Sequence, residues 1–246
     1  MRKFGIIGHP LAHSFSPKWF AEKFKKEGLN DCRYTAYDLP DINQLPLLLH
    51  NLGEELAGLN VTIPYKESVM DFLAGIDKEA AEIGSVNVLK NLPEGWFGFN
   101  TDVYGFRQSI GPFLRTEHER ALILGTGGSS KSIDYVLKSI GISTVFVSRE
   151  AKSATNTISY HDLRPESVRH FKLIINTTPL GTWPEVDLLP PIPYEGIGEN
   201  HLLYDLTYNP PQSKFLSEGA IRGAQTINGY NMLVMQAEKS WEIWNS

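Results

Sequence analysis

The chain has 246 residues, of which 41% are hydrophobic and 11% aromatic, so it can bury a substantial core and form two domains. Its formal net charge is −5, from 23 lysines and arginines against 28 aspartates and glutamates, which argues against the basic surface that nucleic-acid binding requires. The single cysteine, Cys32, excludes an internal disulfide or a cysteine-built zinc site and predicts a reducing compartment. We therefore expect a globular, cytoplasmic protein with Cys32 buried in a strand.

The N-terminal segment predicts neither a signal peptide nor a membrane span, because its apolar run is short and ends at His9-Pro10. His9 and His13 have a metal-like spacing of four residues. Pro10 breaks any helix that would align them, and no third ligand completes a motif. We expect no metal site.

The first hundred residues alternate strand-like and helix-like patterns. Ser16-Pro17 predicts a helix N-cap followed by proline in the first turn, with the helix ending near Gly28. SVNVLK and GWFGFN flank NLPE, which is typical of an antiparallel hairpin. The apolar patterns also predict strands at residues 4–8, 33–39 and 59–63 and helical segments at 42–52 and 66–73.

After residue 120 the apolar runs become longer, as in strands covered on both faces: ALILG, STVFVS, FKLIINTT and LLYDLT. A helical stretch at 129–140, closed by Gly141, separates the first two and predicts a βαβ unit. An amphipathic helix ends the chain, and its apolar stripe needs a partner that the first domain can provide. The fold class is thus α/β, an N-terminal α/β domain plus a Rossmann-type parallel-sheet domain, with the boundary near 102–118.

GTGGSSKS, at 125–132, follows the first long strand and has two interpretations. As a phosphate-binding P-loop it matches Gly125, Lys131 and Ser132 but has Ser130 at the second glycine, while Asp205 could supply a magnesium motif. As a dinucleotide loop, Gly125 makes the tight turn, Gly127 lets the pyrophosphate approach, and small Ser130 allows close packing. The loop alone leaves both open.

The end of the next strand favours NADP. A residue about twenty positions beyond the glycine loop reads the adenosine ribose, and here it is Ser148-Arg149. Arginine can bind a 2′-phosphate bidentately. The alternative is a solvated arginine at a strand end, but the position of Arg149 favours NADP, although the adjacent Glu150 disfavours a phosphate.

Lys66 and Asp102 follow strands at the edge where open α/β sheets bind ligands. Together they could transfer a proton while a nicotinamide exchanges a hydride. Lys66 is also consistent with a surface lysine, and Asp102 with a helix cap. Ser14 and Ser16 could receive a carboxylate, although Ser16 is equally suited to capping.

Motifs along nearly the whole chain resemble, in order, those of the shikimate dehydrogenase family. They are SFSP at 14–17, NVTIPYK at 60–66, SVNVL at 85–89, FNTDVYG at 99–105, GTGGSSKS at 125–132, INTTPLG at 175–181, DLTYNP at 205–210 and GYNMLVMQA at 229–237. The resemblance favours the dinucleotide interpretation. It implies an NADP-dependent oxidoreductase acting on CH–OH, which reduces 3-dehydroshikimate to shikimate in aromatic amino-acid (chorismate) biosynthesis.

The resemblance also implies roles for individual residues. Residues 1–102 and 229–246 would form the substrate-binding, catalytic domain, and residues 103–228 the NADP-binding domain. Lys66 and Asp102 would be the catalytic pair. Substrate would be bound by Ser14, Ser16, Thr62, Asn87, Tyr208 and Gln236. NADP would be bound at its pyrophosphate by Gly125, Thr126, Gly127, Gly128 and Ser129, at its 2′-phosphate by Ser148 and Arg149, and at its nicotinamide by Leu206 and Gly229. We expect small-molecule partners only, with no nucleic acid, membrane or metal, in a monomer or homodimer.

Several positions depart from the family pattern. Phe20-Ala21 stands where a histidine-asparagine pair is usual, Glu150 replaces a threonine, and Asn231 replaces a residue that is often glycine. The connection at 151–160 is shorter and more polar than the usual crossover helix, so we expect it to lack that helix. Three alternatives remain: a quinate or dual quinate/shikimate dehydrogenase using NAD, a P-loop nucleotidase, and a sensor that has lost turnover.

Overall fold

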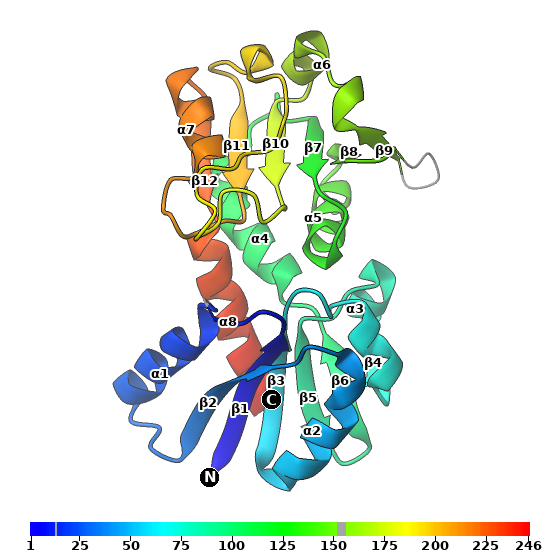
Figure 1. The fold of residues 1–246 in the computed structure, drawn as a ribbon, viewed down its shortest axis with the longest axis vertical. Coiled ribbons are helices and arrows are strands. Elements are labelled where there is room, and N and C mark those ends of the chain that lie inside the picture. Colours follow the sequence, from blue (N-terminus) through cyan, green and yellow to red (C-terminus); the bar gives the residue numbers. More distant parts are fainter. Residues whose placement is uncertain (13, 152–155) are drawn as a thin grey trace. The chain divides into compact units, whose positions relative to one another are not determined.

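The structure is a computed structural model that describes residues 1–12, 14–151 and 156–246. The chain divides into two compact units (Figure 1). Unit 1 comprises Met1–Asp102 and Gln236–Ser246, and unit 2 comprises Val103–Met235. The last helix, α8 (Tyr230–Asn245), therefore contributes residues to both units.

Unit 1 contains a mixed sheet in the order β2-β1-β3-β5-β6-β4. Its strands are β1 (Arg2–Gly8), β2 (Cys32–Asp38), β3 (Leu56–Val61), β4 (Gly75–Ile76), β5 (Val88–Leu92) and β6 (Gly95–Phe99). β1 pairs in parallel with β2 and β3, while β5 and β6 form the predicted antiparallel hairpin. Because β1 and β3 are parallel neighbours, the segments that follow them leave the sheet at the same edge.

Three α-helices of unit 1 accompany this sheet: α1 (Ser16–Glu27), α2 (Leu45–Leu52) and α3 (Lys78–Ile83). α1 ends at Gly28 in a left-handed conformation with φ 70°, as predicted. The predicted cap at Ser16 is wrong, because Phe15 already has helical backbone angles and no side chain caps the helix. The helical pattern at 66–73 forms a 3₁₀ helix, Ser68–Phe72, and 42–52 begins with one at Ile42–Gln44 before α2.

The C-terminal helix packs on the unit 1 sheet, as its apolar stripe predicted. Trp244 is buried against Phe4, with ring centroids 5.0 Å apart, and its indole N–H donates to the Leu89 carbonyl at 3.0 Å. Gly58 lies beneath the ring, where an added Cβ would come within 2.2 Å of the indole nitrogen. Cys32, expected to be buried, is only half-buried because β2 is an edge strand.

Unit 2 has an all-parallel sheet in the order β12-β11-β10-β7-β8-β9. This is the strand order of a doubly wound dinucleotide-binding sheet, so the predicted Rossmann-type fold is confirmed. Its strands are β7 (Arg120–Leu124), β8 (Ser143–Ser148), β9 (Thr157–Ser159), β10 (Leu173–Asn176), β11 (Leu202–Asp205) and β12 (Gln225–Asn228). Its helices are α4 (Asp102–Ile110), whose first residue belongs to unit 1, α5 (Gly128–Ser139), α6 (Pro165–His170), α7 (Lys214–Ile221) and the start of α8.

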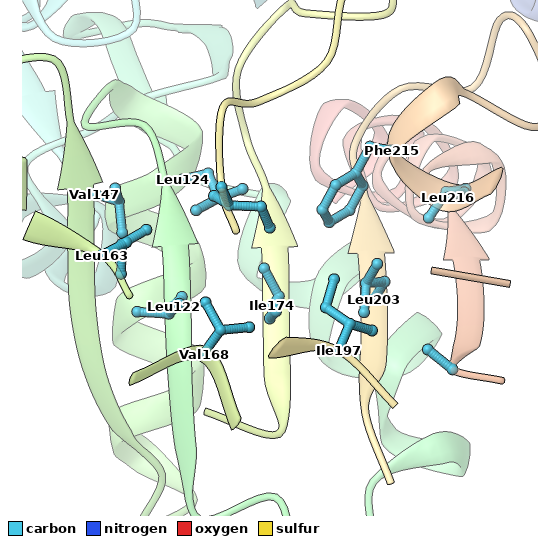
Figure 2. Close-up of a cluster of buried hydrophobic side chains, with 12 residues drawn as sticks. Leu122, Leu124, Val147, Leu163, Val168, Ile174, Ile197, Leu203, Phe215 and Leu216 are labelled. Carbon is cyan, nitrogen blue, oxygen red and sulfur yellow. The ribbon is translucent and has the colours of Figure 1, made fainter. Parts of the chain in front are cut away.

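The strands of unit 2 are covered by apolar side chains, which explains their continuous hydrophobic runs. Figure 2 shows Leu122, Ile174 and Leu203 on neighbouring strands, with Phe215 of α7 packed beside them. The described part of the connection at 151–160 forms β9 and the start of a 3₁₀ helix, Tyr160–Asp162; residues 152–155 lie outside the described residues.

Candidate active site

Lys66 and Asp102, which the sequence suggested as partners, form a buried ion pair in unit 1. The Lys66 Nζ donates to Asp102 Oδ2 at 2.5 Å, and the two residues are 9% and 1% exposed. Lys66 follows β3, where its carbonyl accepts a hydrogen bond from the Val86 amide at 2.7 Å. Asp102 is the first residue of α4. A desolvated ammonium held by a carboxylate is a suitable proton donor to a developing alkoxide.

Asn87 holds the other oxygen of the aspartate. Its Nδ2 donates to Asp102 Oδ1 at 3.0 Å, and its Oδ1 accepts from the Thr101 amide at 2.7 Å. The backbone donor fixes which end of the carboxamide is the oxygen, so the NH₂ group must face the carboxylate. Asn87 therefore restrains the carboxylate that holds Lys66.

Gln236 joins this cluster from α8. Its Oε1 lies 3.1 Å from Asn87 Nδ2, as an acceptor. With the oxygen engaged there, the Gln236 NH₂ group is directed away from Asn87 and is available as a donor to a ligand hydroxyl. The predicted residues Lys66, Asn87, Asp102 and Gln236 thus form one hydrogen-bonded cluster.

The remaining predicted substrate residues lie elsewhere. Ser14 and Thr62 are half-buried in the segments that follow β1 and β3, at the same sheet edge as Lys66. Neither side chain is hydrogen-bonded to the cluster among the described residues. Ser16 interacts with the Tyr34 side chain instead. Tyr208 belongs to unit 2 and follows β11; burial raises the pKa of its phenol.

The glycine loop of unit 2 connects β7 to α5. Gly125 has φ 112°, and an added Cβ would lie 2.5 Å from Thr177 Oγ1, so only glycine fits this turn. A Cβ on Gly127 would meet no atom within 4 Å, which leaves the loop open where a pyrophosphate would approach. Thr126 is exposed, while Gly128 and Ser129 begin the helix with their amides toward its N-terminus.

Two features disfavour the P-loop interpretation of this loop. Ser130 is 1% exposed and its hydroxyl donates to the Gly127 carbonyl at 2.5 Å, so it is packed inside the first turn. Asp205, the candidate magnesium ligand, is fully buried and accepts hydrogen bonds from the Thr207 amide and from Asn176, each at 3.0 Å, and from the Ser213 hydroxyl. Burial raises the pKa of Asp205 to about 6. Its side chain ties the end of β11 to Asn176 at the end of β10 and to Ser213, the N-cap residue of α7.

The other predicted cofactor residues lie at the carboxyl edge of the unit 2 sheet. Ser148 ends β8 and Arg149 is exposed beyond it. Leu206 and Gly229 are in close contact, because a Cβ on Gly229 would lie 2.1 Å from the Leu206 carbonyl oxygen. Across the described residues there is no cluster of His, Cys, Asp and Glu that could hold a metal ion. His13, one of the two spaced histidines, lies outside them.

Two departures from the family pattern have clear structural settings. Phe20 is fully buried, and its ring stacks on Tyr34 with centroids 4.4 Å apart. It therefore belongs to the core behind the site. Asn231 is exposed in the first turn of α8.

Sequence reasoning missed four polar residues behind the cluster: Tyr34, Asn60, Thr101 and Ser240. They form hydrogen bonds with one another or with Asn87. Asn60 and Thr101 lie inside motifs that were recognised, so polar residues within those motifs were the available signal. No sequence signal pointed to Tyr34 or Ser240, because each fits an ordinary strand or helix pattern.

No helix among the described residues is long and apolar enough to cross a membrane.

The chain is similar to known proteins along nearly its whole length. Residues 6–89 match the family model described as the shikimate dehydrogenase substrate binding domain. A protein of Methanococcus maripaludis named shikimate dehydrogenase (NADP(+)) is 35% identical over 98% of this chain and 90% of its own. The shikimate dehydrogenase 1 structure from Peptoclostridium difficile is 35% identical, with a TM-score of 0.86 over 100% and 92% of the two chains. A Thermus thermophilus shikimate 5-dehydrogenase, solved with NADP(H) and shikimate, is 29% identical, with a TM-score of 0.87 over 99% and 93%.

Proposed function

Since the chain belongs to the shikimate dehydrogenase family, we propose that it catalyses the reversible, NADP-dependent reduction of 3-dehydroshikimate to shikimate in aromatic amino-acid biosynthesis. The observation that carries this function is the buried Lys66–Asp102 pair, fixed by Asn87 and Gln236. A relative named for the same activity and a solved shikimate 5-dehydrogenase structure that contains NADP(H) and shikimate support it. We assign substrate binding to residues 1–102 and 229–246, and NADP binding to residues 103–228.

The residues of the glycine loop fit NADP. Gly125 makes a turn that a Cβ would obstruct, Gly127 faces open space, and the α5 amides offer a positive helix terminus to a pyrophosphate. We assign the pyrophosphate to residues 125–129, the 2′-phosphate to Ser148 and Arg149, and the nicotinamide to Leu206 and Gly229. When bound, the cofactor supplies or accepts the hydride at the ring carbon that bears the reacting oxygen.

Lys66 provides the proton for the same reaction. As the carbonyl is reduced, negative charge develops on its oxygen, and the Lys66 ammonium stabilises that charge and donates a proton to it. Asp102 orients the ammonium, and Asn87 keeps the carboxylate in place. In the direction of shikimate oxidation, neutral Lys66 removes the hydroxyl proton.

The remaining polar groups suit a ligand with one carboxylate and three hydroxyls. Ser14, Ser16, Thr62 and Tyr208 offer hydroxyl donors for the carboxylate. Asn87 and Gln236 offer amides for the ring hydroxyls. The relatives named above are shikimate rather than quinate dehydrogenases. The Methanococcus maripaludis protein is named for NADP(+) and the Thermus thermophilus enzyme was solved with NADP(H), so these relatives do not support the quinate and NAD alternative. The presence of both Lys66 and Asp102 argues against a sensor without turnover.

We place the enzyme in the cytoplasm on the basis of its single cysteine, and we expect it to be a monomer or homodimer. The direct test is to mix the protein with shikimate and NADP and to follow the absorbance of the reduced nicotinamide. Parallel assays with quinate, and with magnesium and ATP, test the other two activities. Faster turnover of quinate than of shikimate would contradict the proposed substrate.

A further inference from the structure

Tyr34 of β2 is half-buried and places its hydroxyl behind the proposed substrate site. Its O–H donates to Asn60 Oδ1 on β3 at 2.7 Å. The ring is stacked on Phe20, with an interplanar angle of 9°, and also contacts Trp244 at 6.3 Å between centroids. These aromatic neighbours fix the direction in which the hydroxyl points.

Tyr34 also contacts Ser16, at the end of the site assigned to the substrate carboxylate. The Tyr34 phenol interacts with the Ser16 side chain, while the phenol O–H donates to Asn60 Oδ1. Burial raises the pKa of the Tyr34 phenol well above its ordinary value. The phenol therefore keeps its proton and can donate and accept at the same time.

On its other side, Asn60 connects to the C-terminal helix. Its Nδ2 donates to the Ser240 Oγ at 3.0 Å, and the Ser240 hydroxyl donates to the Gln236 carbonyl at 2.7 Å. Ser240 is fully buried, and its oxygen lies 3.4 Å from Thr101 Oγ1. Thr101 in turn binds the Asn87 side chain, with its backbone N–H donating to Asn87 Oδ1 at 2.7 Å.

We propose that Tyr34 is a positioning residue. Its hydroxyl couples Ser16, at the carboxylate end of the site, to the network of Asn60, Ser240 and Thr101 that holds Asn87 and Gln236 beside Lys66 and Asp102. The inference rests on the proposed function, because Ser16 and Gln236 are assigned there as substrate ligands. The network lies within unit 1 throughout.

Tyr34 supplies the hydrogen bond to Asn60 Oδ1, while Asn60 Nδ2 donates to Ser240 at 3.0 Å and to the Asn87 carbonyl at 3.4 Å. Without the phenol hydroxyl, Asn60 Oδ1 loses this donor, and the Asn60 side chain that supports Ser240 and Asn87 is held less firmly. This change affects groups that would contact shikimate, and it does not affect the NADP site.

The test compares steady-state kinetics of the wild type, Tyr34→Phe, Ser240→Ala and the double variant. Tyr37→Phe is the matched control, since Tyr37 is also on β2 and loses the same atom. We expect Tyr34→Phe to raise the KM for shikimate roughly tenfold, the effect of about one lost hydrogen bond. The KM for NADP should stay within about twofold, and Tyr37→Phe should resemble the wild type.

The double variant separates coupling from independent damage. If Tyr34 and Ser240 act through one network, the double variant should raise the KM for shikimate no more than the larger single effect. Multiplied effects, equal changes in both KM values, or a Tyr34→Phe enzyme identical to the wild type would overturn the proposal. If Tyr34→Phe does not fold, a double-mutant cycle of Ser16→Ala and Ser240→Ala tests the same coupling from the two ends of the network. A wild type inactive with shikimate and NADP would instead reject the proposed function itself.

Discussion

Replacing Lys66 by methionine removes the cation of the buried ion pair while keeping an unbranched side chain of similar length. Asp102 is 1% exposed, so water cannot replace the lost partner. Removing one member of a buried pair costs about 3–5 kcal/mol. Asp102 keeps the hydrogen bond from Asn87 at 3.0 Å, so its carboxylate is not left without any donor. We therefore expect the Lys66→Met variant to lose about 3 kcal/mol of unfolding free energy, the lower end of that range.

A second substitution separates stability from catalysis. The Asp102→Asn substitution keeps an oxygen that can accept from Asn87 but removes the unpaired buried charge. We therefore expect the Lys66→Met/Asp102→Asn variant to regain about 2 kcal/mol of the unfolding free energy that Lys66→Met loses. The assays are urea unfolding and steady-state kinetics. Both variants should show kcat reduced by about 10²–10⁴-fold, because neither can donate the proton.

The control is Lys78→Met, since Lys78 is an exposed lysine at the start of α3. It should change neither stability nor kcat. The account would be refuted if Lys66→Met were as stable as the wild type, or if the Asp102→Asn change gave no recovery. Equal changes in kcat and in the affinity for shikimate would make Lys66 a binding residue.

Three further predictions concern unit 2. Gly125→Ala should weaken NADP binding and lower stability by about 1–3 kcal/mol, because φ is 112° and the Cβ would meet Thr177; unchanged NADP affinity by calorimetry would contradict this. The enzyme should prefer NADPH to NADH, and Arg149→Ala should reduce that preference; equal use of NADH by the wild type would refute the role of Arg149. Asp205 has a pKa of about 6 in the folded protein, above the unfolded value of about 3.9, so its burial costs stability at neutral pH. This cost disappears as the pH falls from about 6 to 4. The stability of Asp205→Asn relative to the wild type should therefore fall by up to about 3 kcal/mol between pH 7 and pH 4, and a pH-independent difference in unfolding free energy would contradict it.

Local patterns in the sequence were sufficient for most of the fold. The runs around Leu122 and Ile174 predicted strands covered on both faces, and Gly125 predicted the tight turn that its φ requires. The local sequence was misleading at Ser16, where Ser16-Pro17 predicted a helix N-cap. The backbone of Phe15 had already entered the helix, and the Ser16 hydroxyl is engaged by Tyr34.

Local patterns predicted the site only where its residues follow strands, whereas Asn87 and Gln236 were predicted from the family resemblance. Lys66 and Asp102 could be paired because both follow strands at one edge, and their contact is present in the structure. Their catalytic role remains a prediction. The support from Tyr34 and Ser240 could not be foreseen, since the two residues are far apart in the chain and meet only through Asn60 in the folded sheet. No periodicity in either segment distinguishes them from ordinary core positions.

The most direct test of the central claim is a single turnover assay in which wild type and Lys66→Met are each mixed with shikimate and NADP. The account predicts reduced nicotinamide from the wild type and almost none from the variant, with NADP bound equally by both. Rapid nicotinamide reduction by Lys66→Met would show that the buried ammonium does not transfer the proton.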